Sequence, residues 1–367
     1  MKYYIIAGES SGDLYGSLLM SELKRIDSDA TFKFWGGPQM REKSSGQLKS
    51  IKETSFMGFY EVAKNALKIK GFFDFAKYSI KEFNPDIVIL IDYPGFNLRI
   101  AKWAKLQGFH TAYYISPQLW AWKQNRHKIL KEYIDLFYVI LPFERDFYRN
   151  LDTPCEFVGH PLMEIIDKPN EHIQEAVKKI GLFPGSRKQE IRNHLATMIQ
   201  FAIEKPEYKF IIAGVSHIPK SFYLDHLKQY AAHIDIRYDA SHEVMSEIDF
   251  AITSSGTATL ELALFNVPQI VIYKTHHLSF MIGKRLVKTD YISLVNLIGQ
   301  KEIVPELLQD AFNELALDKY FELSSQYSKR KETVEYYDKI RKELGSKPTS
   351  KLIANGILNF LNKKSVE

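Results

Sequence analysis

Cysteine is almost absent from this sequence, which contains only Cys155. One cysteine cannot form an intramolecular disulfide, and the sequence has no Cys-x-x-Cys or Cys/His spacing of a zinc site. It also lacks the GxxxxGK[ST] motif of P-loop ATPases and the GxGxxG spacing of dinucleotide-binding turns. These absences favour a reducing compartment and predict neither a bound metal nor a cofactor.

Long apolar runs and targeting signals are lacking as well. No apolar run approaches the roughly 20 residues that a membrane-spanning helix requires, so we expect any membrane contact to be peripheral. Met1–Gly8 leads directly into a predicted strand, without the apolar stretch and cleavage site of a signal peptide, which indicates a cytoplasmic protein. The net charge of +5 is too small to identify a partner.

The chain is long enough for two domains. Its 367 residues exceed what one hydrophobic core usually sustains, and 45% hydrophobic with 25% charged residues is typical of a globular protein. The polar stretch near residues 165–175 predicts the boundary. We expect a first domain over residues 1–165, a second over 175–345, and a final helix within 346–367 that packs back on the first domain.

Short β-rich runs alternate with longer helical ones, which predicts an α/β fold of two doubly wound, Rossmann-like domains facing across a cleft. In the first domain the expected elements are strands 3–7, 31–35, 87–91 and 111–115 and a helix over 14–24. In the second domain they are strands 181–184, 210–214, 250–253 and 269–273, followed by a last helix over 350–362.

The run Ile87–Ile91 is apolar without alternation, as in a strand buried on both faces, and it ends at Asp92. Open α/β sheets bind their ligands at the carboxyl ends of strands. Asp92 is therefore a candidate general base that removes a hydroxyl proton. A rigid turn stabilised by Asp92 is the structural alternative.

Two turns of the second domain are suited to anions. Gly185, Ser186 and Arg187 lie between a strand and a helix, where free N–H groups and the helix dipole favour a phosphate. The turn Ser254-Ser255-Gly256-Thr257 has the same placement, and Glu261 one helical turn later could accept hydrogen bonds from ribose. The alternatives are an ordinary glycine turn and a surface carboxylate.

The first domain offers polar and aromatic side chains for a sugar. For the turn of residues 9–13 the alternative is an N-terminal helix cap. For the two tryptophans it is simple packing, and for His160 a structural role. The candidates are Glu9, Ser10, Ser11, Asp13, Trp120, Trp122 and His160, and Lys123, Arg126 and Lys128 are candidates for an acceptor phosphate.

An amphipathic segment between Met57 and Lys77 combines aromatic and aliphatic residues with lysines, which suits an anionic membrane surface. A core-facing helix with a solvated lysine face is the alternative. We expect a break at Gly71 that leaves the following phenylalanines exposed. The predicted membrane-facing residues are Phe59, Val62, Leu67, Ile69, Phe72 and Phe73.

Taken together, these loops resemble the lipid-A-disaccharide synthase family from the first strand to about Gln309. The motifs, in chain order, are AGESSGD (7–13), SPQLWAW (116–122), LPFE (141–144), FVGHP (157–161), FPGSR (183–187), SGTATLE (255–261) and KRLVKTDY (284–291). The set is specific because its members keep their order and spacing. Gly95 departs from the pattern, since some relatives carry an acidic residue there.

The resemblance implies a GT-B fold and an inverting, metal-independent transfer. The donor would be UDP-2,3-diacylglucosamine and the acceptor 2,3-diacylglucosamine 1-phosphate (lipid X), giving a β-1,6-linked disaccharide and UDP. It further implies that Asp92 is the base, that Arg187, Glu261 and Asn296 bind UDP, and that Ser254–Thr257 and Gln309 lie nearby. The first domain would bind the acceptor and the membrane, and the second the donor.

Two other functions remain open from the residues alone. One is an enzyme like UDP-N-acetylglucosamine epimerase, which has the same two-lobed fold. The other is a peripheral membrane protein that binds a nucleotide sugar without catalysis. We expect the inner face of the cytoplasmic membrane as a partner surface and no nucleic acid, and a homodimer stays open.

Overall fold

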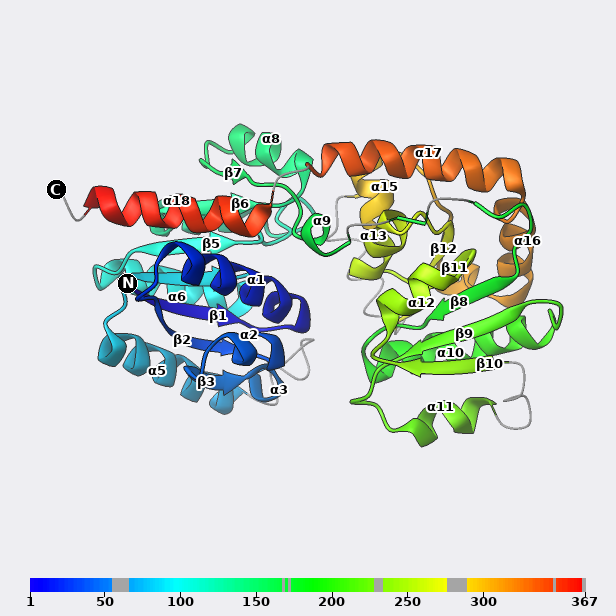
Figure 1. Ribbon diagram of the computed structural model, residues 1–367, viewed down its shortest axis with the longest axis horizontal. Coiled ribbons are helices and arrows are strands. Elements are labelled where there is room, and N and C mark those ends of the chain that lie inside the picture. The colour runs from blue at the N-terminus through cyan, green and yellow to red at the C-terminus, as the bar shows by residue number, and fades with distance from the viewer. Residues whose placement is uncertain are drawn as a thin grey trace. The chain divides into compact units, whose positions relative to one another are not determined.

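The chain folds into two compact units. Figure 1 shows the computed structural model, which describes residues 1–54, 66–166, 169–170, 173–227, 234–275, 289–345 and 348–364. The first unit comprises Met1–Pro161 and Leu344–Glu367, and the second comprises Leu162–Glu343. The chain therefore returns to its first unit with its last helix.

A parallel sheet with the strand order β3-β2-β1-β4-β5-β6-β7 forms the centre of the first unit. Its strands are β1 (Lys2–Ala7), β2 (Thr31–Gly36), β3 (Gln47–Ser50), β4 (Ile87–Ile91), β5 (Thr111–Tyr114), β6 (Leu136–Val139) and β7 (Glu156–Phe157). All residues of β4 are completely buried. The prediction of a strand buried on both faces is confirmed.

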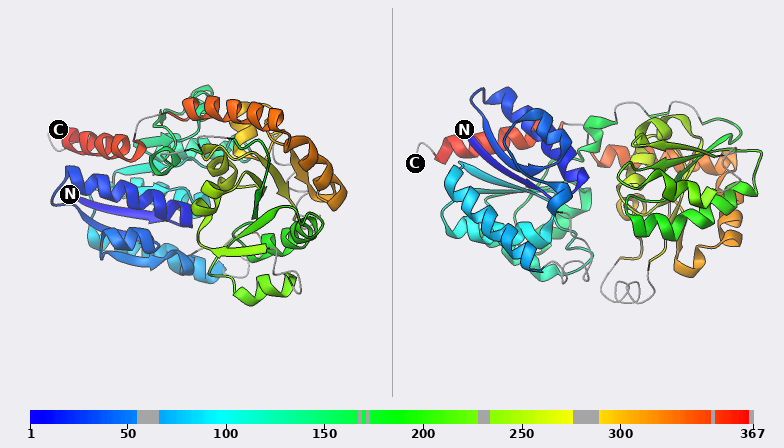
Figure 2. Two further views of the ribbon diagram at one scale, coloured as in Figure 1. Left: turned by 45° about the vertical axis from the view of Figure 1, so that its right-hand side comes forward. Right: turned by 90° about the horizontal axis from the view of Figure 1, so that it is seen from below.

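Helices lie on both faces of this sheet (Figure 2, right view). On one face α1 (Ser10–Ile26) packs with α2 (Pro38–Lys43) and the last helix, α18 (Thr349–Lys364). On the other face α6 (Pro94–Leu106) packs with α5 (Ala66–Phe83) and α7 (His127–Tyr133). The shorter helices are α3 (Ile51–Thr54), η1 (Gln124–Arg126) and α8 (Pro142–Asn150).

The core of the first unit contains a buried polar chain among aromatic rings. Trp35 Nε1 donates to Tyr4 Oη at 3.0 Å, and Tyr4 Oη lies 2.6 Å from Ser79 Oγ. The ring of Phe72 packs edge-on against Trp35 with 6.0 Å between centroids. The expected break at Gly71 is wrong, because α5 continues through it and turns Phe72 into the core.

The second unit has a parallel sheet with the order β10-β9-β8-β11-β12-β13. Its strands are β8 (Lys179–Phe183), β9 (Lys209–Gly214), β10 (Ile234–Tyr238), β11 (Phe250–Ser254), β12 (Gln269–Tyr273) and β13 (Glu306–Leu308). Its helices are α9 (Leu162–Ile165), α10 (Lys188–Ile203), α11 (Lys220–Leu227), α12 (Ser241–Glu247), α13 (Thr257–Leu264), α15 (Leu294–Gly299), η3 (Gln309–Ala311), α16 (Glu314–Ser324) and α17 (Tyr327–Glu343).

The two sheets confirm the predicted α/β class, and the strands that the sequence missed are mostly edge strands. β3 and β7 lie at the edges of the first sheet, and β10 and β13 at the edges of the second. Such strands are short and half-buried, so their apolar pattern is weak. Within the described ranges, no helix is long and apolar enough to cross a membrane.

Candidate functional site

Asp92 lies immediately after β4, at the carboxyl edge of the first sheet, in a strained backbone. Asp92 and Tyr93 both have positive φ, 46° and 49°, a region that side-chain-bearing residues rarely occupy. The Asp92 N–H donates to Tyr114 O at 2.9 Å, and its own carbonyl accepts from Tyr113 Oη at 2.7 Å. Strain of this kind persists only where surrounding contacts hold it, and it gathers at functional sites.

The loop after β1 lies against the loop after β4. A Cβ added to Gly8 would come within 2.3 Å of the Tyr93 ring, so only glycine permits this approach. Glu9 follows Gly8 directly, at the start of α1, with Ser10 exposed and Ser11 partly exposed in the first helical turn. The structure thus brings the predicted Glu9 turn and Asp92 to one place.

The carboxyl group of Asp92 is hard to ionise. Burial raises its pKa to about 7, and the neighbouring Glu9 and Glu144 add to this, against the opposing hydrogen bond from the Tyr93 backbone. A carboxyl group with a pKa near 7 accepts a proton from a substrate hydroxyl far better than an ordinary one. This is the electrostatic setting of a general base.

Glu144, which sequence analysis quoted only as part of a motif, is the organiser of the neighbouring tryptophan loop. It is 1% exposed, and its Oε1 accepts from Ser116 Oγ at 2.9 Å and Trp120 Nε1 at 3.3 Å. Its Oε2 accepts the backbone N–H groups of Ile140 and Leu141. Burial raises the pKa of Glu144 to about 7, which these donors oppose.

Two predicted sugar-binding residues are instead parts of the fold. Asp13 is 2% exposed, and its two oxygens accept the N–H groups of Gly37, Gln39 and Met40, which places it at the start of α2. His160 is equally buried beside Tyr15, and burial lowers its pKa to about 3, so it is neutral. We assign both to the fold and leave them out of the proposed site.

In the second unit the structure brings the two predicted anion turns together. Strands β8 and β11 are neighbours, and a Cβ on Gly185 would lie 3.3 Å from Ser254 Oγ. Gly185 has φ 114°, which requires glycine, and Gly256 precedes α13 as its N-terminal cap. The N-termini of α10 and α13 thus begin side by side, and both helix dipoles favour an anion there.

The remaining groups of these turns are partly engaged. Arg187 is half exposed, and its Nη1 lies 2.6 Å from Glu190 Oε1, so a ligand anion must compete with this carboxylate. Ser186 is exposed, while Ser255 Oγ donates to Ile292 O at 3.0 Å. Thr257 opens α13 and is partly exposed.

Glu261 has a partner that sequence analysis did not anticipate. His242, in the first turn of α12, places its Nε2 3.4 Å from Glu261 Oε1. The hydrogen bond to Glu261 raises the pKa of His242 against the opposing effect of burial. The pair holds the carboxylate of Glu261 at the carboxyl edge of the second sheet.

Asn296 and Gln309 differ in how many of their side-chain hydrogen-bonding atoms have partners. Asn296 is fully buried, and its side-chain amide donates to Val304 O and Glu306 Oε1 while its oxygen accepts two N–H groups. It therefore shapes the segment before β13. Gln309 has φ 54°, and its Oε1 accepts the Thr275 N–H, but its buried Nε2 has no acceptor among the described residues.

Two buried side chains that the sequence analysis assigned no role fix the strand ends. Asn97 Nδ2 lies 2.8, 3.2 and 3.3 Å from the carbonyl oxygens of Asp92, Ile91 and Ile6. His194 Nδ1 lies 2.8 Å from Pro184 O, and its Nε2 accepts the Lys274 N–H at 3.0 Å. Asn97 and His194 are each a polar residue on the inner face of a helix. This pattern in the sequence could have identified them as structural residues.

Only part of the predicted membrane-facing segment lies in the described residues. Phe59 and Val62 are outside them, as is most of the motif 284–291. Leu67 is 88% exposed and Ile69 partly so, whereas Phe73 stacks on Phe96 with 4.3 Å between centroids. The exposed surface at the start of α5 therefore comes from Leu67 and its neighbouring lysines.

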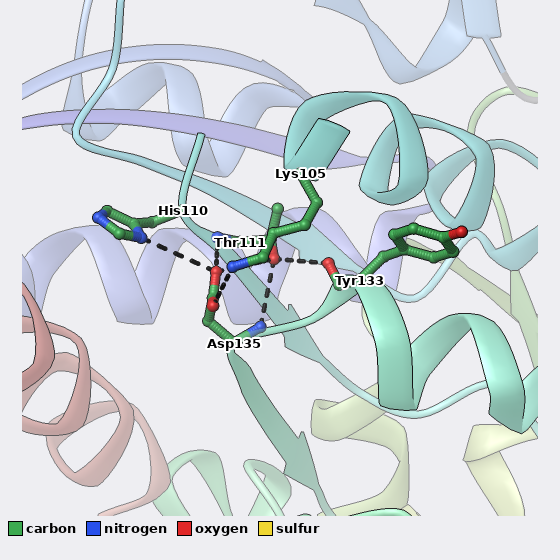
Figure 3. A network of polar contacts seen from close by, with 5 residues as sticks. All are labelled: Lys105, His110, Thr111, Tyr133 and Asp135. Atoms are coloured by element: carbon green, nitrogen blue, oxygen red, sulfur yellow. Dashed lines mark hydrogen bonds and ion pairs between the residues drawn. The ribbon is translucent and has the colours of Figure 1, made fainter. Parts of the chain in front are cut away.

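A cavity of about 470 Å³ in the first unit lies at the opposite, amino edge of the sheet, beside Asp86 and His110. Figure 3 shows the contacts next to it: Asp135 accepts from Lys105 Nζ and from the Thr111 N–H, and lies 3.9 Å from His110 Nδ1. These contacts join the starts of β5 and β6. We assign this edge to stability.

The fold defines the class of the protein. A structure described as the glycotransferase of kitacinnamycin matches with a TM-score of 0.67 and 12% identity, over 98% of both chains. The UDP-GlcNAc 2-epimerase of Neisseria meningitidis matches with a TM-score of 0.65 and 14% identity, over 98% of this chain and 100% of that one. The chain thus has the GT-B fold of glycosyltransferases and nucleotide-sugar epimerases.

The sequence comparisons show the family within this class. A family model described as lipid-A-disaccharide synthetase matches residues 3–353. The lipid-A-disaccharide synthase of Nitrosococcus oceani is 38% identical over 317 residues, 83% of this chain and 82% of that protein. The enzyme of Geobacter sulfurreducens is 33% identical, over 98% and 97%. The chain belongs to the lipid-A-disaccharide synthase family.

Proposed function

We propose that the chain transfers 2,3-diacylglucosamine from UDP-2,3-diacylglucosamine to 2,3-diacylglucosamine 1-phosphate, forming a β-1,6-linked disaccharide and UDP. Family membership supports the substrate classes. The observation that carries the chemistry is Asp92, a strained carboxyl group at a strand end with a pKa of about 7. Its position and proton affinity suit a base rather than a structural turn.

In the proposed reaction the acceptor's 6-hydroxyl oxygen attacks the anomeric carbon of the donor. Its proton passes to Asp92, the new C–O bond forms, and the bond to the diphosphate breaks on the opposite face. The electron pair leaves with UDP, so the configuration inverts. Tyr113 and Asn97 hold the backbone of Asp92 through its carbonyl oxygen, which keeps the carboxyl group at the strand end.

We assign the diphosphate to the second unit. Negative charge grows on the departing UDP in the transition state, where N–H groups at the starts of α10 and α13, Arg187 and Gln309 would stabilise it. We assign the ribose to Glu261, held by His242. No step in this scheme needs a metal ion.

We further propose that the first unit takes the acceptor and rests on the inner face of the cytoplasmic membrane. The exposed Leu67 at the start of α5, with Lys68 and Lys70 beside it, supports this assignment, since apolar and basic residues together favour an anionic interface.

The test is release of UDP from the two acylated glucosamine substrates in detergent. We expect UDP and a disaccharide only when both substrates are present, and an Asp92→Asn variant should lose about 10²–10⁴-fold in kcat while binding UDP normally. Near-normal turnover of that variant would remove Asp92 from the base role.

The matched control is Asp146→Asn, which removes an exposed carboxylate that pairs with the surface arginines Arg145 and Arg149. Such pairs contribute little, so this variant should keep wild-type turnover. Interconversion of UDP-N-acetylglucosamine without any acceptor would favour the epimerase alternative instead.

A further inference from the structure

Three cations near the carboxyl edge of the first sheet have no acidic partner within the described ranges. They are Arg99 on α6, Lys123 in the tryptophan loop and Arg126 at the end of η1. Their side chains lie over aromatic rings. Arg99 lies over Phe73, and Lys123 and Arg126 lie over Trp122. Positive charge is therefore concentrated here without compensation by the protein.

Lys123 and Arg126 contact the same ring, and Arg99 contributes to the electrostatics of Arg126. Lys123 Nζ lies 4.3 Å and Arg126 Cζ 5.8 Å from the centroid of the Trp122 ring. Burial lowers the pKa of Arg126, and Arg99 lowers it further, against the opposing effect of Tyr113. Burial and Arg126 likewise lower the pKa of Lys123. Mutual repulsion of this kind destabilises the protein unless an anion relieves it.

Some other cations of the same unit are paired with carboxylates. Lys105, on the same helix as Arg99, pairs with Asp135 (Figure 3). Lys131 on α7 pairs with Asp152. Lys81 and Lys102 also lie over aromatic rings, so what sets Lys123 and Arg126 apart is that both cations share the ring of Trp122.

The cluster adjoins the proposed base. Tyr113 Oη donates to the Asp92 carbonyl at 2.7 Å, and Arg126 and Asp92 both affect the pKa of Tyr113. Tyr113 therefore links the strand end that carries Asp92 to the electrostatic field of Arg126.

We propose that Arg99, Lys123 and Arg126, beside the Trp122 ring, form the subsite for the phosphate monoester of the acceptor sugar. A phosphate monoester carries about −1.5 to −2 charges at neutral pH and three acceptor oxygens, which suits three cations. Arginine binds such a group through two parallel hydrogen bonds and lysine as a point charge. This assignment rests on the proposed function, because it takes the acceptor to be a phosphorylated sugar.

The backbone at Lys123 gives independent support. Its φ is 54°, in the left-handed region that favours glycine. A lysine at this position costs stability, which is expected where the side chain has a function. A Lys123→Gly variant should therefore keep or raise the melting temperature while it loses phosphate recognition, which separates function from folding.

The first experiment compares the acceptor with its analogue that lacks the phosphate. Wild-type enzyme should show a KM for the unphosphorylated analogue about 10- to 100-fold higher than for the acceptor, as expected for lost charge-assisted hydrogen bonds. Arg126→Ala and Lys123→Gly should raise the KM for the phosphorylated acceptor toward that of the analogue and leave the donor KM unchanged. Arg126→Lys should restore part of the preference.

The matched control is Lys81→Ala. Lys81 Nζ lies over the Trp103 ring at 5.8 Å, near the end of α5, so this variant removes one charge and one contact of the same kind elsewhere. It should discriminate between the two acceptors as wild type does. If Arg126→Ala and Lys123→Gly also discriminate as wild type does, the subsite is disproved.

A second measurement does not depend on transfer. Glucosamine 1-phosphate should change the tryptophan fluorescence of wild-type protein, glucosamine should not, and Arg126→Ala should abolish the response. If UDP release fails but this response is present, the proposed function is wrong while a sugar-phosphate subsite stands. If Arg126→Ala and Lys123→Gly lose binding to phosphatidylglycerol vesicles but keep the preference for the phosphorylated sugar, the cluster binds lipid headgroups and the proposal is overturned.

Discussion

Asp92 shows how a single carboxyl group becomes a base through its surroundings. In the unfolded chain its pKa is near the ordinary value of 3.8, and in the fold it rises to about 7. Burial is the main cause, and the charge of Glu9 contributes more than that of Glu144. The same residue in a solvated turn would be too weak a base for a sugar hydroxyl.

The pH dependence of activity follows from this shift. Since only the ionised form accepts a proton, kcat/KM for the acceptor should fall below about pH 7. A Glu9→Gln variant removes a neighbouring negative charge, so its acid limb should move to lower pH whatever its maximal rate. The measurement is a pH–rate profile of both proteins with saturating donor.

The raised pKa of Asp92 also makes the stability of the fold depend on pH. Because the folded pKa of Asp92 lies above the unfolded one, ionisation of Asp92 increasingly destabilises the fold between about pH 4 and pH 7. Asp92→Asn should therefore melt at a higher temperature than wild type at pH 8, and the difference should shrink toward pH 4. Equal melting temperatures at both pH values would show that the carboxyl group has an ordinary pKa.

At the scale of elements, the contact between α18 and β6 depends on one glycine. A Cβ on Gly356 would lie 2.4 Å from Tyr138 Oη, and that buried hydroxyl has no hydrogen-bond partner among the described residues. Glycine in a helix costs up to about 1 kcal/mol relative to alanine. Here the close approach of the tyrosine outweighs that cost.

A double-mutant cycle tests this contact. Gly356→Ala alone should lower the free energy of unfolding of the first unit, because the methyl group meets the hydroxyl. In the Tyr138→Phe background the same change should be neutral or stabilising by up to about 1 kcal/mol. Chemical denaturation of the four proteins gives the coupling energy, and additive effects would contradict the contact.

The sequence predicted most of the central elements and none of the edge strands. Ile87–Ile91 was recognisable because a strand buried on both faces reads as an uninterrupted apolar run. Gly71 was misleading, because packing of Phe72 against Trp35 overrides the low helix propensity of glycine. Local pattern predicts what a segment prefers, and packing decides what it does.

At the scale of the whole molecule, the last helix, α18, belongs to the first unit. The residues of the second unit separate it in sequence from the rest of the first unit. It packs against α1, and its buried side chains include Ile353, Ile357 and Leu361. Burial of each such side chain contributes about 1.5–3 kcal/mol. The first unit therefore depends on the last residues of the chain.

Deletion of residues 346–367 should destabilise the first unit selectively. Hydrogen exchange at the amides of β4 should accelerate strongly, while exchange at the amides of β11 in the second unit should stay near wild type. A Lys351→Ala variant, which changes only an exposed position of the same helix, serves as the control. Unchanged exchange at β4 after the deletion would show that α18 contributes little to the first unit.

The sequence by itself determined the two parallel-sheet units, the position of Asp92 at a strand end and the two glycine turns, because strand periodicity and turn chemistry are local. It also carried the family motifs. Only the tertiary structure decided which polar residues have partners. Asp13, His160 and Asn296 are buried in the fold, whereas Gln309 Nε2 has no acceptor and Arg99, Lys123 and Arg126 have no carboxylate among the described residues. Hydrogen-bond partners and burial come from residues distant in the chain, so no local pattern contains them.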